Sequence, residues 1–456
     1  MINNFDDTIS AVATVLGTGG VSIIRLSGEK SEEVINKIFF KNNNLEHADF
    51  IPNSIAHGYI YDNGSLLDEV VVLYFKAPHS YTGEDVFEIQ CHGGVNVTKA
   101  ILDLTLKNGA RLAQRGEFTK RAFLNGKLDL SQAESVLDII SAKTTKFAKE
   151  SANNLCGKLA VKIREIRERI IELLSHIVAA IDFPEEVEEP DYDAIGEEIS
   201  SITEDIEKIL KCSKSSNLLR QGIKICLAGK PNVGKSSLFN NILNYERAIV
   251  TDIAGTTRDI INESLDINGI PATITDTAGI RELTDNNDTD KVENIGIEYS
   301  KRSIDEADII IFLTDLSANT TQEDEKIYEI IKNKKHINVG TKSDLKSADN
   351  HFSTEINISN TDKTGIDELI NKISEIILND IETSETDFFT NERQQEALEN
   401  AKLSLQKAKE SAIARAEQDF IAIDIKSALM HLGEITGDDI TQEIINNIFE
   451  KFCIGK

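Results

Sequence analysis

The stretch Gly229-Lys-Pro-Asn-Val-Gly-Lys-Ser236 decides the fold of the central part of this chain. It matches the phosphate-binding pattern G-x-x-x-x-G-K-[ST]. In that pattern glycines let backbone N–H groups approach phosphates, the lysine reaches the β- and γ-phosphates, and the serine hydroxyl holds Mg²⁺. The apolar run Ile223–Ala228 precedes it and a helical pattern follows, which is the strand, loop and helix order that the pattern needs. An ordinary Gly-rich turn is the weaker alternative in this context. Further strand-like runs at Ala272–Thr275 and Ile309–Leu313 alternate with helical spacing, so we predict an α/β domain with a mostly parallel sheet.

Two further segments narrow the nucleotide to GTP. Asp276-Thr-Ala-Gly279 follows a predicted strand, where the aspartate can hold the Mg²⁺ shell and the Gly279 N–H can contact the γ-phosphate. In Thr341-Lys-Ser-Asp344, Asp344 can accept two hydrogen bonds from guanine that adenine does not offer. Many GTPases have Asn at the position of Thr341, so the guanine preference rests mainly on Asp344. Ser359–Asn360 is a candidate for the loop that completes the base pocket.

The segment Thr251-Asp-Ile-Ala-Gly-Thr-Thr-Arg-Asp259 lies between the first two motifs. Thr257 is placed to complete, with Ser236, the Mg²⁺ shell. Arg258 resembles an arginine finger, but it adjoins the metal-binding threonine, and we favour a structural or salt-bridging role. The residues expected to contact GTP are Asn232, Val233, Gly234, Lys235, Ser236, Ser237, Thr251, Asp252, Ile253, Ala254, Gly255, Thr256, Thr257, Asp276, Thr277, Ala278, Gly279, Thr341, Lys342, Ser343, Asp344, Ser359 and Asn360.

Composition limits the cellular setting. The net charge of -28 argues against a chain that coats itself in nucleic acid, although it leaves room for a local basic patch. The 5 cysteines have no metal-ligand spacing, which favours reduced thiols in the cytosol. The N-terminal stretch lacks a basic flank and is not typical of a signal peptide, and no apolar run approaches membrane-spanning length. We expect a cytoplasmic protein that does not enter a membrane.

The 456 residues allow two to four domains. Residues 1–125 have the short apolar runs and Gly-rich turns of a mixed α/β domain, whereas residues 130–217 and those after about 380 have helical periodicity. The nucleotide-binding domain is therefore expected to be an insertion, with the helices before and after it packing together.

Segments throughout the chain resemble the MnmE (TrmE) family of tRNA modification GTPases. The segments that carry the resemblance, besides the nucleotide motifs, are Gly19–Gly28, Tyr81–Gly94, Gly116–Leu130, Ala180–Pro184, Leu432–Gly437 and the terminal Phe452-Cys-Ile-Gly-Lys456. The resemblance implies an N-terminal α/β folate-binding and dimerisation domain over 1–122. It implies a helical domain in two parts, 123–217 and 380–456, around a Ras-like GTPase domain over 218–379.

The resemblance also implies an activity. The family forms homodimers and acts with the flavoprotein MnmG, which uses FAD and NADH, in an expected heterotetramer. Together they add a carboxymethylaminomethyl or aminomethyl group at C5 of the wobble uridine of certain tRNAs. The one-carbon donor is a tetrahydrofolate derivative in the 5-formyl or 5,10-methylene form. The alternative is a regulatory GTPase switch in ribosome assembly or a membrane process, which the N-terminal segments and the tail disfavour.

The resemblance assigns a K⁺ site to Asn232, Thr251, Ile253 and Thr256. A cation beside the β- and γ-phosphates can supply the charge that an arginine finger otherwise supplies. It also implies that Glu293 orients the attacking water and acts with Lys235 and Gly279 in catalysis. The segment Asp285–Asp290 departs from the family spacing as an apparent insertion between Asp276 and Glu293.

The resemblance assigns folate contacts to Arg25, Glu88, Lys127 and Lys456. One carboxylate and several cations suit the polar pterin edge and glutamate tail of a folate. Cys453 has two open interpretations: a thiol activated by nearby lysines, or a buried small hydrophobe.

Overall fold

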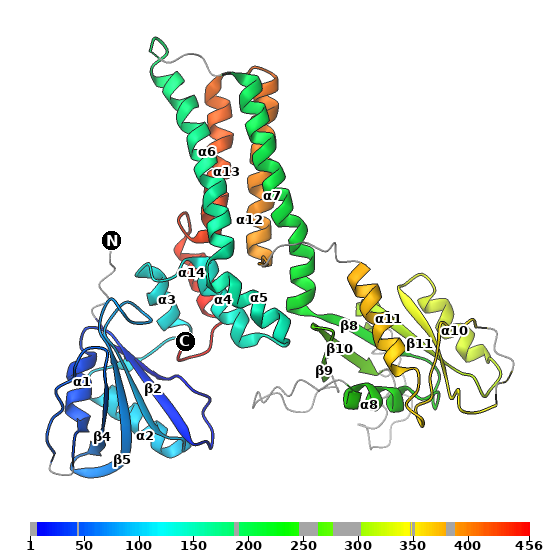
Figure 1. Cartoon of the computed structure of the whole chain (residues 1–456), viewed down its shortest axis with the longest axis horizontal. Helices are drawn as coiled ribbons and strands as arrows, with labels where there is room; N and C mark the ends of the chain where they lie inside the picture. The colour runs from blue at the N-terminus through cyan, green and yellow to red at the C-terminus, as the bar shows by residue number, and fades with distance from the viewer. Residues whose placement is uncertain are drawn as a thin grey trace. The chain divides into compact units, whose positions relative to one another are not determined.

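The computed structural model describes residues 7–42, 45–186, 191–245, 263–276, 302–346, 348, 352–379 and 388–456 (Figure 1). The chain divides into two compact units. The first comprises Met1–Leu137, Asn154–Ile195 and Leu403–Lys456, and the second comprises Asp138–Asn153 and Gly196–Lys402. The two long helices α7 (Tyr192–Gln221) and α12 (Glu392–Ile413) have residues in both. The domain boundaries expected from the sequence stay predictions.

The first unit contains a seven-stranded sheet in the order β3-β4-β5-β6-β2-β1-β7, antiparallel except where β1 pairs with β7. Its strands are β1 (Ile9–Val12), β2 (Val21–Ser27), β3 (Phe39–Phe40), β4 (Ile55–Asp62), β5 (Ser65–Phe75), β6 (Val86–His92) and β7 (Arg111–Leu112). The helices α1 (Ser31–Ile38) and α2 (Val95–Lys107) bury their apolar faces against it (Figure 1). Side chains along β1 alternate between the two faces of the sheet. Ser10 faces α2 and accepts a hydrogen bond from Thr105, whereas Ile9 and Ala11 lie on the other face and pack with Phe118.

Helices complete the first unit. They are α3 (Glu117–Leu124), α4 (Leu130–Ser141, up to Leu137), α6 (Lys158–Asp182), α13 (Gln418–Thr436) and α14 (Gln442–Phe449). The predicted periodic stripe of α6 is buried at Ile163, Ile166, Ile170 and Ile177. α6 packs along α13, so helices before and after the nucleotide domain lie side by side, as predicted (Figure 1). Among the described residues, no helix is both long and apolar enough to cross a bilayer.

The second unit contains a six-stranded sheet in the order β13-β12-β11-β8-β10-β9, in which the β9–β10 pair alone is antiparallel. Its strands are β8 (Ile223–Ala228), β9 (Glu263–Ile267), β10 (Ile270–Asp276), β11 (Ile309–Asp315), β12 (His336–Thr341) and β13 (Ile356–Asn357). The helices α8 (Lys235–Tyr245) and α11 (Ile366–Asn379) pack in one core, and α10 (Gln322–Ile331) packs in another. Parallel strands buried on both faces explain the continuous apolar runs, and the predicted α/β fold with a mostly parallel sheet is confirmed.

Helix α5 (Thr145–Leu155) contributes to the second unit, although it precedes the nucleotide domain by many residues. Phe147 is only 2% exposed and its ring lies 5.1 Å from that of Phe389. The Lys146 stem packs at the β9–β10 turn, where a Cβ on Gly269 would lie 3.1 Å from Lys146 Cδ. Asp138 forms an ion pair with Arg220 of α7 at 3.1 Å. The core of the nucleotide-binding unit therefore extends to this early helix.

We predict that Phe147→Ala lowers the free energy of unfolding of the second unit by about 3–5 kcal/mol, the usual cost of removing a buried phenyl ring. Urea denaturation followed by circular dichroism measures the change. Ile330→Ala is the matched control because that side chain, on α10 of the same unit, is 48% exposed, and it should change the free energy by less than about 0.5 kcal/mol. Equal losses for the two variants would contradict the assignment of α5 to this core.

Candidate functional sites

The loops after β8, β11 and β12 meet at one edge of the six-stranded sheet. Parallel pairing sets Phe312 opposite Ala228, the end of β8, and Asp315 opposite Thr341, the ends of β11 and β12, so the carboxyl ends of the three strands lie at the same edge. In open α/β sheets, ligands bind at the carboxyl ends of the strands. This edge therefore collects the predicted phosphate loop and the predicted base-binding loops.

The phosphate loop runs from β8 into α8 with three positive φ angles: 153° at Gly229, 63° at Asn232 and 106° at Gly234. The φ of 106° at Gly234 is one that L side chains rarely adopt, which favours glycine there, and a Cβ would also displace the Asn360 amide, 2.9 Å away. Lys235 is 5% exposed, and its ammonium group donates to Gly229 O at 2.6 Å and to Lys230 O at 2.9 Å. The ammonium group of Lys235 thus lies between carbonyl groups of the loop. Charged phosphate oxygens would be stronger hydrogen-bond acceptors for this ammonium group than the neutral carbonyl oxygens are.

Thr341 ties the base-binding segment to the phosphate loop. Its side chain is fully buried, and Oγ1 donates to Val233 O at 2.7 Å and lies 3.1 Å from Thr314 O. Lys342, with φ of 59°, extends its ammonium to Asp315 Oδ2 at 2.6 Å. Burial opposes ionisation of Asp315, but hydrogen bonds from Lys342 and Ser317 hold its pKa below the ordinary value. A threonine therefore makes a buried link at the position where many GTPases have Asn.

The Ser359–Asn360 loop is joined to both predicted motifs. Ser359 Oγ donates to Asp344 Oδ1 at 2.7 Å, which fixes one carboxylate oxygen. Asn360 Nδ2 donates to Gly234 O at 3.2 Å, and Asn241 of α8 donates to Asn360 O at 3.0 Å. The structure thus brings the described members of the predicted site together: Asn232, Val233, Gly234, Lys235, Ser236, Ser237, Thr341, Lys342, Ser343, Asp344, Ser359 and Asn360.

The remaining predicted residues of the nucleotide site lie outside the described residues. They are Thr251, Asp252, Ile253, Ala254, Gly255, Thr256, Thr257, Thr277, Ala278, Gly279 and Glu293. The backbone of Asp276 is described as the last residue of β10, paired with Leu227 of β8. The segment Asp285–Asp290, interpreted as an insertion, is also outside the described residues.

Sequence reasoning missed an ion pair at the start of the phosphate loop. Lys230 Nζ lies 2.8 Å from Asp324 Oδ2, and the Asp324 side chain is 3% exposed. Asp324 also accepts hydrogen bonds from the backbone and hydroxyl of Thr321 in a capping box at the start of α10. The spacing Thr-x-x-Asp carries the signal of a helix start. It carries no information that the aspartate also binds Lys230.

A second polar site lies on the seven-stranded sheet. Arg25 of β2 is paired in register with Glu88 of β6, and Arg25 Nε lies 2.8 Å from Glu88 Oε1. The Arg25 guanidinium lies 5.3 Å from the Tyr81 ring centre and 5.6 Å from that of Phe118, within cation–π range. Burial and the charge of Arg25 hold the pKa of Lys456 below its ordinary value, while Glu88 opposes this shift. Arg25, Glu88 and Lys456 therefore form one electrostatic group.

The C-terminal tail reaches this site along the loop before α3. Phe118 N donates to Lys456 O at 3.2 Å and Gly116 N donates to Cys453 O at 3.3 Å. Cys453 is exposed, so its interpretation as a buried small hydrophobe is wrong, and its reactivity stays a prediction.

Lys127 is also exposed and donates to Pro78 O at 3.0 Å. Its described contacts do not join it to Arg25. Among the described residues, no group of three or more His, Cys, Asp or Glu side chains could hold a metal ion.

The chain is similar to known proteins over its full length. The model of the MnmE helical domain matches residues 130–453, and that of the GTP-binding protein TrmE N-terminus matches residues 8–127. The chain is 44% identical over 465 residues to the tRNA modification GTPase MnmE of Clostridioides difficile, covering 99% of both chains. It is 45% identical over 463 residues to that of Thermoanaerobacter pseudethanolicus, again covering 99% of both. Among solved structures it is similar to Era from Aquifex aeolicus, at 25% identity over 40% of this chain and 66% of that chain, with a TM-score of 0.26.

We predict that Thr341→Val weakens GDP binding about tenfold, because Val233 O loses its buried donor at a cost of about 1–3 kcal/mol. Isothermal titration calorimetry measures the affinity. Thr314→Val is the control: within the described part of the chain, its buried hydroxyl has no hydrogen-bond partner. The control should stay within twofold of the unaltered chain, and an equal loss in both variants would contradict the role of Thr341.

Proposed function

The chain belongs to the MnmE family of tRNA modification GTPases, and we propose that it couples GTP hydrolysis at the sheet edge to one-carbon chemistry at the Arg25 site. Two hydrogen bonds support the proposed GTP site: the buried bond from the Thr341 hydroxyl to Val233 O in the phosphate loop, and the bond from the Ser359 hydroxyl to the Asp344 carboxylate. These hydrogen bonds join the phosphate-binding and base-binding loops into one site. Asp344 is the residue that selects guanine.

Mg²⁺ and K⁺ are the proposed ions of this site. Ser236 is exposed in the first turn of α8, where its hydroxyl suits the oxygen preference of Mg²⁺, and Thr257 is the second proposed ligand. Asn232 is exposed in the phosphate loop, and its side-chain oxygen suits K⁺, with Thr251, Ile253 and Thr256 as the other proposed ligands.

The catalytic roles are proposed in the same way. Lys235 begins α8 and would bind the β- and γ-phosphates. The Gly279 N–H would contact the γ-phosphate, and Glu293 would orient the attacking water.

A tetrahydrofolate derivative, in the 5-formyl or 5,10-methylene form, is the proposed ligand of the second site. Arg25 and Lys456 supply cations for the carboxylates of a folate tail, and Glu88 can accept hydrogen bonds from a pterin edge. The half-buried Tyr81 ring beside Arg25 supplies apolar surface for the ligand, and the buried Phe118 ring supports the Arg25 guanidinium from within the fold. Lys127 is proposed as a further contact from the neighbouring loop.

The proposed reaction requires partners. A homodimer of this chain would act with the flavoprotein MnmG, carrying FAD and NADH, as a heterotetramer in the cytoplasm. It would install a carboxymethylaminomethyl or aminomethyl group at C5 of the wobble uridine of certain tRNAs. The net charge of -28 favours tRNA binding through a local basic patch or through the partner. A regulatory switch in ribosome assembly or a membrane process is the less supported alternative, because the similarity extends over the whole chain.

Reconstitution tests this function. The purified chain, the flavoprotein, FAD, NADH, 5,10-methylenetetrahydrofolate, GTP, unmodified tRNA and glycine or ammonium, as the source of the amine nitrogen, should yield a C5-modified wobble uridine, detected by nucleoside mass spectrometry. Arg25→Met should abolish the product, because it removes the cation paired with Glu88. Arg164→Met also loses one guanidinium, from an exposed pair with Asp129, and should keep the product. Unmodified uridine in the complete mixture, while GTP is hydrolysed, would favour the regulatory switch.

We predict that GTP hydrolysis is at least about tenfold faster in KCl than in NaCl at equal ionic strength, a barrier difference of about 1.4 kcal/mol. Phosphate release measures the rate. Asn232→Ala should remove the difference, because it removes a proposed K⁺ ligand. Asn240→Ala, on the exposed side of α8, should keep it. Equal rates of the unaltered chain in the two salts would exclude the K⁺ site.

A further inference from the structure

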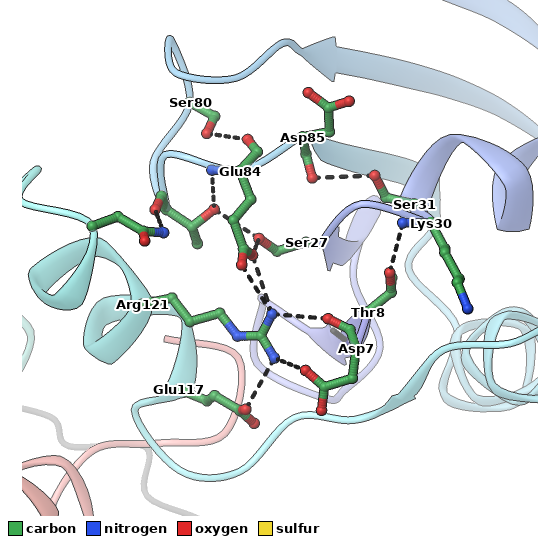
Figure 2. A network of polar contacts seen from close by, with 12 residues as sticks. Asp7, Thr8, Ser27, Lys30, Ser31, Ser80, Glu84, Asp85, Glu117 and Arg121 are labelled. Carbon is green, nitrogen blue, oxygen red and sulfur yellow. Dashed lines mark hydrogen bonds and ion pairs between the residues drawn. The ribbon is translucent and has the colours of Figure 1, made fainter. Parts of the chain in front are cut away.

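Arg121 of α3 is a fully buried cation that joins three segments of the first unit (Figure 2). Its guanidinium lies 2.6 Å from Asp7 Oδ1, 3.1 Å from Glu84 Oε1 and 3.3 Å from Glu117 Oε1. Asp7 precedes β1 and Glu84 lies in the loop before β6, so only Glu117 is local to the helix. A buried guanidinium is costly unless it is fully paired. The network therefore holds α3 against two distant segments.

Glu84 passes this restraint to the loop Ser80–Asp85 (Figure 2). Its Oε2 accepts from Ser27 Oγ of β2 at 2.6 Å, and its backbone N–H donates to Thr82 Oγ1 at 3.2 Å. Ser80 Oγ donates to the carbonyl of Glu84, and Asn125 Nδ2 donates to Thr82 O at 2.8 Å. The loop is thus anchored to β2 and to the end of α3, with Arg121 at the centre.

Tyr81, in this anchored loop, and Phe118, on α3, are the two rings beside Arg25. The Tyr81 hydroxyl lies 2.9 Å from Thr119 Oγ1 on α3, and burial raises the pKa of Tyr81, so the phenol stays neutral. Phe118 also donates its backbone N–H to Lys456 O. The loop and α3 therefore each supply one ring to the Arg25 site, and Arg121 joins the two.

Comparison with Arg111 distinguishes the connection that Arg121 makes between α3 and the loop from its contribution to charge balance in the network. It binds Glu117 Oε1 at 2.5 Å and Asp7 Oδ2 at 2.5 Å, so it shares two of the three carboxylates. Burial opposes ionisation of Glu117, but Arg111, the Gln114 N–H and Arg121 hold its pKa below the ordinary value. Glu84 forms its ion pair with Arg121 and has no described contact with Arg111. Arg121 therefore differs from Arg111 in its ion pair with Glu84, which connects it to the loop Ser80–Asp85.

We propose that Arg121 is a positioning residue for the Arg25 site, which acts through Glu84 and α3 to hold Tyr81 and Phe118 beside the Arg25 guanidinium. The identity of the ligand rests on the proposed function, whereas the placement of the rings does not. With the rings held, Arg25 keeps one orientation before a ligand arrives, and the cost of ordering it on binding is avoided. Loss of Arg121 removes the ion pair between the loop and α3 and leaves only the hydrogen bonds of Tyr81 with Thr119 and of Asn125 with Thr82 to hold them. The rings are then held less firmly beside Arg25.

The placement of Tyr81 can be measured without a ligand. In a chain labelled with 3-fluorotyrosine, ¹⁹F NMR resolves the 8 tyrosines, and Tyr81→Phe identifies the Tyr81 signal. Arg121→Met should move this signal toward the shift of exposed fluorotyrosine. It should also weaken binding of 5-formyltetrahydrofolate at least about tenfold. Glu84→Gln should move the signal in the same direction, and Arg121→Lys should do so to a smaller extent because it keeps the charge.

Arg111→Met is the matched control. It removes one positive charge from the same network but no contact with Glu84, and its side chain is 42% exposed. Its Tyr81 signal should stay at the unaltered position and its folate affinity within twofold. A folded Arg121→Met chain with an unmoved Tyr81 signal overturns the proposal, as does an equal movement in Arg111→Met. If Arg121→Met does not fold, Glu84→Gln and Arg121→Lys decide by the same signal. Absence of folate binding by the unaltered chain refutes the proposed ligand, while the Tyr81 signal still decides the role of Arg121.

Discussion

The parallel pairing of β11 with β8 on one side and β12 on the other is the constraint on which the nucleotide site depends. All positions of β11 are buried, so its register is fixed by apolar packing on both faces. A shift of one residue would move Asp315 away from Thr341 and separate the loops that follow the strands. Because the register holds, short polar contacts suffice at the edge: the Thr341 hydroxyl reaches Val233 O, and the Asn360 amide reaches Gly234 O.

Thr341 shows that holding the site and recognising the base are separate tasks. The Thr341 hydroxyl is consumed by the buried link to the phosphate loop. Asp344, three residues later, is exposed at the sheet edge and oriented by Ser359. A chain can therefore replace the usual Asn with a smaller donor, provided that the donor still reaches the loop carbonyl. The exchange leaves the proposed guanine preference unaffected, because we assign that preference to the Asp344 carboxylate.

The sequence could predict the elements whose signal is local. The run Ile223–Ala228 coincides with β8 because a strand buried on both faces must be apolar throughout. The phosphate loop was recognisable because its backbone and chemistry require Gly, Lys and Ser at fixed positions. By contrast, the sequence around Phe147 does not indicate which core buries this ring. The sequence around Arg121 likewise does not indicate that Asp7 and Glu84 form ion pairs with it. Both outcomes depend on contacts between distant segments, which neither periodicity nor spacing encodes. The roles of Thr251, Ile253, Thr256 and Glu293 remain predictions from family resemblance, and the role of Thr257 remains a prediction from its place between the nucleotide motifs.

Lys235 and Arg121 show how the partners of a buried cation determine what it can do. Two of the groups that hold Lys235 are the carbonyl groups of Gly229 and Lys230, which are neutral dipoles. A phosphate with full negative charge attracts the ammonium more strongly, so Lys235 can transfer to a ligand. Arg121 is held by three carboxylates, and moving it to a ligand would leave Glu84, whose side chain is 14% exposed, without its described ion-pair partner. The first arrangement suits a group that binds substrate, and the second suits a group that never leaves its place. On this physical ground Arg121 acts on the Arg25 site through the segments it holds rather than through contact with a ligand.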